Sequence, residues 1–147
     1  RDARIMNIYE GTSQLQVVAA INGITKGTFM EQIARYAEAE YCDAVKPAVE
    51  KLAALTERVK AMVERVETIN RDFPAYKDFH ARRLVESVGY IVMTYLLARQ
   101  SGEAAEYVSD TRLMLKMTEA YIAAAETYIA NSEGSDVALI NEVGEQY

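Results

Sequence analysis

The sequence predicts an all-α protein, an up-and-down four-helix bundle with one short extra helix at its N-terminal end. Only seven Gly and two Pro occur in 147 residues, while Ala, Glu, Leu and Val are abundant. Such a composition favours helices, because Ala and straight-chain residues lose little side-chain freedom there. Apolar residues also recur every three or four positions along the chain, as in helices that pack around a shared core. No segment predicts a strand.

Two capping boxes predict the first helices. In a capping box, a Ser or Thr accepts a hydrogen bond from the third helical N–H, and a Glu or Gln reaches back. Residues 13–16, Ser-Gln-Leu-Gln, predict a short helix that runs to about Ala20 and ends near residues 22–23. Residues 28–31, Thr-Phe-Met-Glu, predict a second helix with an apolar row formed by Met30, Ile33, Ala37 and Tyr41.

A seven-residue apolar repeat predicts the next, long helix. Pro47 is tolerated near a helix start, so this helix either begins there or bends. The segment Asp-Phe-Pro at 72–74 ends it. The repeat consists of two rows, Val45, Leu52, Val59, Val66 and Phe73, and beside them Ala48, Leu55, Met62 and Ile69.

Two further long helices follow. The helix around Leu84, Val88, Ile91 and Tyr95 is apolar over much of its circumference, so we expect it to lie deepest, and Ser101-Gly102 ends it. The last helix repeats Val108, Leu115, Ile122 and Ile129, with Tyr107, Met114, Tyr121 and Tyr128 one position earlier. That second row indicates core or helix-packing surface, or a subunit interface if it is exposed. The patterns thus divide the chain into an N-terminal segment (1–25), a bundle domain (26–132) and an acidic tail (133–147).

Composition and charge exclude several classes of function. The net charge is −6 and the basic residues are scattered, so we expect no nucleic-acid surface. The apolar runs are too short for a transmembrane segment. A single cysteine cannot form an internal disulfide, which is compatible with a cytoplasmic protein. The absence of an initiator Met indicates a processed or excised segment.

The first sixteen residues carry a specific motif. They read Arg-Asp-Ala-Arg-Ile-Met-Asn-Ile-Tyr-Glu-Gly-Thr-Ser-Gln-Leu-Gln. This segment resembles the signature of the acyl-CoA dehydrogenase family around its catalytic glutamate. The length of chain that follows is similar to members of that family with an additional C-terminal helical domain. The resemblance implies that residues 1–25 are a remnant of the dehydrogenase's own C-terminal helical domain and carry its catalytic-base motif.

The resemblance implies a reaction and a set of site residues. Glu10 would remove the α-proton of an acyl-CoA thioester while the β-hydride passes to FAD. Gly11 would contact the substrate thioester, and Thr12, Ser13 and Gln14 would line the FAD. The parent enzyme would use acyl-CoA in fatty acid metabolism and pass its electrons to an electron-transferring flavoprotein. We also expect a homo-oligomer.

The chemistry suits these residue types. A carboxylate is a weak base in water, and removal of water by an apolar acyl chain would strengthen it. A helix N-terminus near Glu10 would act in the opposite direction by favouring the anion. Gly11 permits a close approach of the backbone to a ligand.

This chain lacks the other domains that hold flavin and substrate in the family. We therefore expect the fragment alone to bind no FAD and to be inactive. The alternative function is a non-catalytic helical module for dimerisation, membrane docking or partner binding.

Three other candidates are weaker. The sole histidine, His80, has neither a second His nor a Cys-x-x-Cys motif nearby, so we expect no metal site and a surface or capping role. Cys42 is interpreted as a small buried apolar residue rather than a nucleophile. Arg82 and Arg83 indicate a solvated face more readily than a phosphate or membrane contact.

Overall fold

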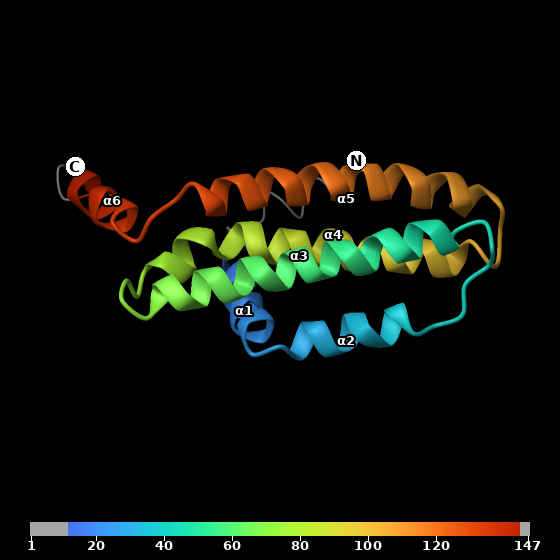
Figure 1. Ribbon diagram of the computed structural model, residues 1–147, viewed down its shortest axis with the longest axis horizontal. Helices are drawn as coiled ribbons and strands as arrows, with labels where there is room; N and C mark the ends of the chain where they lie inside the picture. Colours follow the sequence, from blue (N-terminus) through green and yellow to red (C-terminus); the bar gives the residue numbers. More distant parts are fainter. Residues whose placement is uncertain (1–11, 145–147) are drawn as a thin grey trace.

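The computed structural model describes residues 12–144 and contains helices and connecting loops. The helices are α1 (Thr12–Thr25), α2 (Thr28–Ala37), α3 (Lys46–Asn70), α4 (Tyr76–Gln100), α5 (Glu106–Ala130) and α6 (Asp136–Gly144). The three long helices α3, α4 and α5 lie alongside one another, and α2 runs along the side of this group away from α5 (Figure 1). The all-α bundle predicted from the sequence is therefore confirmed.

Helix α4 lies at the centre, as its apolar circumference predicts. It packs against α5, α3, α1 and α2. Its side chains Tyr76, Leu84, Ile91 and Tyr95 are completely buried. Because four other helices surround it, this helix has little surface left for polar residues. Its sequence is therefore apolar over much of the circumference.

Helix α3 follows the predicted repeat closely. Pro47 is its second residue, where the missing N–H costs no helical hydrogen bond, so the helix begins there and does not bend. Leu52, Val59 and Val66 are fully buried, whereas Phe73 lies beyond the helix end and is 43% exposed. Phe73 therefore does not belong to the core row in which the repeat placed it.

The short helices deviate from the predicted boundaries. Helix α1 begins at Thr12, one residue before the predicted cap Ser13, and continues to Thr25. Helix α2 is preceded by Gly27 with φ of 83°, and Thr28 forms no side-chain cap. Because Gly27 adopts the left-handed conformation at little cost, it makes the corner between the two helices. Tyr41 lies beyond α2, and its hydroxyl donates to the Tyr36 carbonyl at 2.7 Å.

The segment predicted as an acidic tail contains helix α6. Figure 1 shows this helix beyond the end of the long helices. The loop before it packs tightly, because a Cβ atom on Gly134 would lie 2.1 Å from the ring of Phe73. The missing side chain at Gly134 thus lets the α3–α4 connection contact the α5–α6 connection.

Candidate functional site

The residues predicted to carry catalysis lie at the edge of the described structure. Glu10 and Gly11 are outside the described residues. Thr12, Ser13 and Gln14 form the first turn of α1, but their side chains are outside the description as well. Their predicted roles therefore remain predictions.

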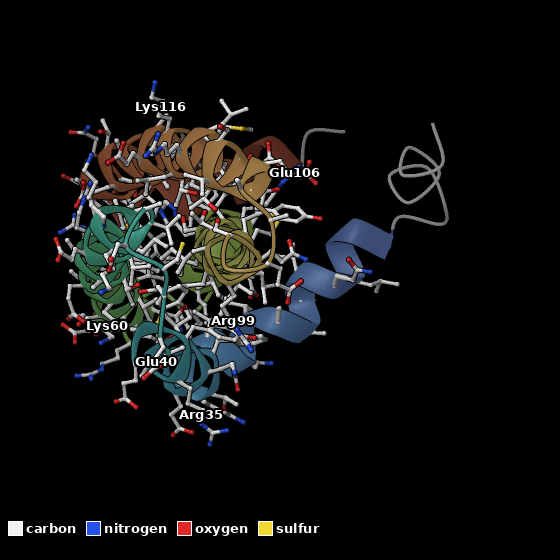
Figure 2. The ribbon with its side chains drawn as sticks, turned by 90° about the vertical axis from the view of Figure 1, so that its right-hand side faces the viewer. Arg35, Glu40, Lys60, Arg99, Glu106 and Lys116 are labelled. Carbon is white, nitrogen blue, oxygen red and sulfur yellow. The ribbon has the colours of Figure 1, made fainter. Side chains whose placement is uncertain are left out.

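Helix α1, which follows directly, is apolar on both sides. Its fourteen residues include no charged side chain. Val17, Ile21 and Ile24 are buried on one side, and α4 is the main contact. On the other side Leu15 and Val18 are 67% and 54% exposed. Figure 2 shows α1 projecting away from the bundle, so within residues 12–144 no other helix covers its outer side.

A polar cluster lies buried where α5 ends against the start of α4. The Ser132 Oγ lies 2.7 Å from the Tyr76 hydroxyl and 2.8 Å from His80 Nε2. The same Oγ lies 3.2 Å from the carbonyl oxygen of Ile129. All three side chains are at most 4% exposed. The prediction that His80 is a surface or capping residue is therefore wrong: helix packing, which the local sequence does not reveal, encloses it.

Burial changes the ionisation of His80. Desolvation, helped by the positive charges of Arg83 and Arg65, lowers its pKa from 6.5 to about 4. The imidazole is thus neutral at physiological pH, because desolvation and the two arginines disfavour the charged form more than the nearby Asp136 carboxylate favours it. In the described part of the chain, Nδ1 has no hydrogen-bond partner.

A serine within hydrogen-bond distance of a histidine also occurs in nucleophilic catalysis. There the base must be oriented by a third group, and the serine must reach a substrate. Here Ser132 is 4% exposed, and its oxygen is shared with Tyr76 and the Ile129 carbonyl. The cluster therefore acts as a structural pin that joins the end of α5 to α4.

Arg65 and Asn131 complete the end of α5. The Arg65 guanidinium donates to the carbonyl oxygens of Ile129 and Ala130 at 3.2 Å. The Asn131 side chain donates to the Thr127 carbonyl at 2.8 Å. Carbonyls at a helix C-terminus lack partners within the helix, and these donors satisfy them.

An apolar hollow of about 980 Å³ lies on the surface next to this cluster. Its lining comes from the start of α4, the second half of α5, the following loop and α6. The sequence patterns do not predict this hollow, because they do not predict α6. The adjacent small residues Ala123 and Ala124 are the sequence feature that could have indicated a depression on α5. The lining residues are Phe79, Ala123, Ala124, Thr127, Tyr128, Asn131, Ser132, Asp136 and Leu139.

The adjacent arginines have different contacts. Arg82 forms an ion pair with Glu86 at 2.7 Å on the surface of α4. The guanidinium carbon of Arg83 lies 3.7 Å from the centre of the Tyr128 ring. Arg83 therefore places a positive charge over an aromatic ring at the edge of the hollow.

The remaining candidates contribute no assembled site. Cys42 is half-buried, with its Sγ 3.7 Å from the Ser101 carbonyl oxygen. Within residues 12–144, no three His, Cys, Asp or Glu side chains come together as metal ligands would. None of the helices in that range is long and apolar enough to cross a membrane. Figure 2 shows Arg35, Lys60 and Lys116 pointing outward in separate directions.

The fold and its buried polar contacts define a helical bundle domain. The family profile described as acyl-CoA dehydrogenase C terminal matches residues 25–137. The chain therefore belongs to the acyl-CoA dehydrogenase C-terminal family.

A solved structure supports the same assignment. It is titled an acyl-CoA dehydrogenase family protein from Porphyromonas gingivalis, and it has 28% sequence identity and a TM-score of 0.71 with this chain. The match covers 78% of this chain and 98% of the other, so the bundle accounts for nearly all of that chain. A comparison with curated protein sequences finds no match.

Proposed function

We propose that this chain is the C-terminal part of an FAD-dependent acyl-CoA dehydrogenase, which oxidises the Cα–Cβ bond of acyl-CoA thioesters. The observation that carries this proposal is the motif at residues 1–16, which precedes the family region at 25–137 in the same chain. The motif and the family region therefore point to the same class of enzyme from separate parts of the chain.

Glu10 is the proposed base. It would take the α-proton of the thioester, and FAD, when bound, would supply the acceptor for the β-hydride. Glu10 precedes the first residue of α1 by two positions in the sequence, and a carboxylate close to a helix N-terminus is favoured as the anion in the absence of substrate. An acyl chain that displaces water raises the proton affinity of the carboxylate, so the base gains strength when substrate is in place.

The first turn of α1 fits an anionic cofactor. The N–H groups of Thr12, Ser13 and Gln14 belong to the turn that has no helical acceptors, and such turns bind phosphate groups. In this proposal these three residues hold FAD, and Gly11 allows the backbone to approach the thioester.

The outer side of α1 supports a larger protein around it. A helix that is apolar on both sides is normally covered on both sides. Leu15 and Val18 are exposed here, although α1 has no charged residue to keep that side in water. In the proposed enzyme, the preceding dehydrogenase domains cover this side and bring substrate and flavin to Glu10.

The test of the catalytic proposal is Glu10→Gln in the intact enzyme. Acyl-CoA oxidation should fall by about 10²-fold or more, because a proton acceptor is lost, while flavin absorbance should be retained. Electron-transferring flavoprotein is the proposed electron acceptor for the assay. Glu31→Gln, on the exposed side of α2, is the matched control variant. Unchanged oxidation by the Glu10→Gln enzyme would remove Glu10 from the base role.

A second function belongs to the bundle itself. The exposed apolar side chains of α5, such as Leu113 at 61% exposure, favour a non-catalytic interaction module. In this proposal the isolated chain binds no FAD and oxidises no acyl-CoA. Purification of the chain with added FAD tests this, since a stoichiometric flavin spectrum would contradict it.

A further inference from the structure

The outer side of α5 carries a second apolar surface. Leu113, Met117 and Tyr128 are 61%, 47% and 50% exposed. Ala120 and Ala124 are exposed between them. These five residues, called the outer stripe below, recur at three- and four-residue spacing and so lie on one side of the helix. The opposite side of α5, which includes Leu115, Ile122 and Ile129, is buried against α3 and α4.

The outer stripe has a protruding half and a hollow half. In the first half, Leu113 and Met117 are long and exposed. In the second half, Ala123 and Ala124 are small, and the hollow of about 980 Å³ opens beside them. Tyr128 and Leu139 border that hollow. One helix therefore offers both apolar side chains that protrude and a depression of matching chemistry.

We propose that two copies of this chain associate through antiparallel α5 helices, so that Leu113 and Met117 of each copy enter the hollow of the other. A two-fold axis between Ala120 and Tyr121 places position 113 opposite Tyr128 and position 117 opposite Ala124. Ala120, the residue of the outer stripe nearest the axis, is small and exposed, so the two helices can approach closely there. Because a two-fold axis repeats each contact, the protruding side chains of each copy fill the hollow of the other copy at the same time.

Charge favours the same pairing. Arg83 forms no ion pair within residues 12–144 and lies over Tyr128, and an exposed Asp110 precedes Leu113 by one turn of α5. In the antiparallel pair, Leu113 of one copy meets Tyr128 of the other, which brings Asp110 to the side of the hollow that Arg83 borders. Asp136, the acid in the hollow, already accepts a hydrogen bond from the Glu133 N–H at 2.8 Å. Tyr and Arg are also the side chains that contribute most often to association energy.

The chain contains a matched control for this surface. Leu15 on α1 and Leu113 on α5 are both exposed leucines, at 67% and 61%, on different helices. Sedimentation of the full 147-residue chain should show a concentration-dependent dimer. Leu113→Glu should weaken dimerisation at least about tenfold, because two charges would be buried at the pairing, whereas Leu15→Glu should leave it unchanged. Circular dichroism verifies that both variants remain folded.

Cross-linking tests the direction of the pairing. In a Cys42→Ser background, Ala120→Cys should form a disulfide-linked dimer, since the two positions meet at the axis. Leu113→Cys should not, because the two copies of this residue lie fifteen positions apart along the pair, about 22 Å.

Three outcomes would overturn the proposal. One is a chain that stays monomeric at every concentration. A monomer whose hollow binds an added fatty acid such as palmitate would count as this same outcome. Another is a dimer that Leu15→Glu dissociates and Leu113→Glu does not. The third is efficient cross-linking through Leu113→Cys, which would mean a parallel pair.

Discussion

His80 Nε2 lies 2.8 Å from Ser132 Oγ, and this contact connects the first turns of α4 to the second residue after the end of α5. These residues are 52 positions apart in the chain. Tyr76 contacts the same serine through its hydroxyl. One small hydroxyl thus satisfies two larger polar side chains in the interior, and its loss should be costly.

Ser132→Ala should lower the free energy of unfolding by about 1–3 kcal/mol, because His80 Nε2 would lose its partner in a buried site. Tyr76 would keep a 3.2 Å hydrogen bond to the Ser132 backbone carbonyl, so part of the cluster would survive. Urea denaturation measures the change. Ser109→Ala, at an exposed position in the first turn of α5, is the control and should be nearly neutral. Equal stability of the two variants would show that the cluster contributes nothing.

Stability should also depend on pH through His80. Its pKa is about 4 in the folded protein and 6.5 in a solvated reference, so the unfolded chain binds a proton first as the pH falls. The stabilisation is complete above about pH 6.5 and is lost as the pH falls toward 4, with an upper magnitude of about 3 kcal/mol.

His80→Gln isolates this effect, because glutamine can still contact Ser132 but does not titrate. Denaturation between pH 7 and pH 4 should show a shallower loss of stability for this variant than for the wild type. Identical pH profiles would mean that carboxylates alone account for the acid sensitivity.

A pair of threonines should show strong coupling between α4 and α5. Thr94 Oγ1 and Thr118 Oγ1 lie 2.8 Å apart, and both side chains are fully buried. Thr118→Val should destabilise by about 1 kcal/mol, because Thr94 loses this partner. The double variant Thr94→Val/Thr118→Val should be less destabilised than the sum of the single variants, since no hydroxyl is left without its neighbour. Strict additivity in a double-mutant cycle would rule out the coupling.

Gly134→Ala should disturb the contact between the two connections. The added Cβ would lie 2.1–2.5 Å from atoms of the Phe73 ring, including its Cγ. The ring must move as a whole, at a cost of about 1–3 kcal/mol. Phe73→Ala in the Gly134→Ala background should restore part of that loss, because it removes the clashing ring. Thermal unfolding compares the four proteins, and a fully stable Gly134→Ala variant would contradict the tight contact.

The amino-acid sequence alone predicts those helices that bury a continuous apolar side. The seven-residue repeat of α3 and the wide apolar circumference of α4 predicted both helices and the central position of α4. These patterns are local records of burial, because helical geometry brings every third or fourth residue to one side. The motif at residues 1–16 likewise indicated the acyl-CoA dehydrogenase family before any packing was known, and the family is confirmed by residues 25–137.

Contacts between segments far apart in the sequence become visible in the tertiary structure alone. The sequence predicts a surface or capping role for His80, yet this residue is buried against Ser132 at the end of α5. The loop before helix α6 fits through Gly134 against Phe73, which lies sixty-one positions earlier in the chain. Apolar periodicity shows which side of a helix is buried. It does not show which other helix covers that side, or which polar group on that helix forms a hydrogen bond with it. The physical reason is that both are set by how the helices pack together, which no local pattern encodes.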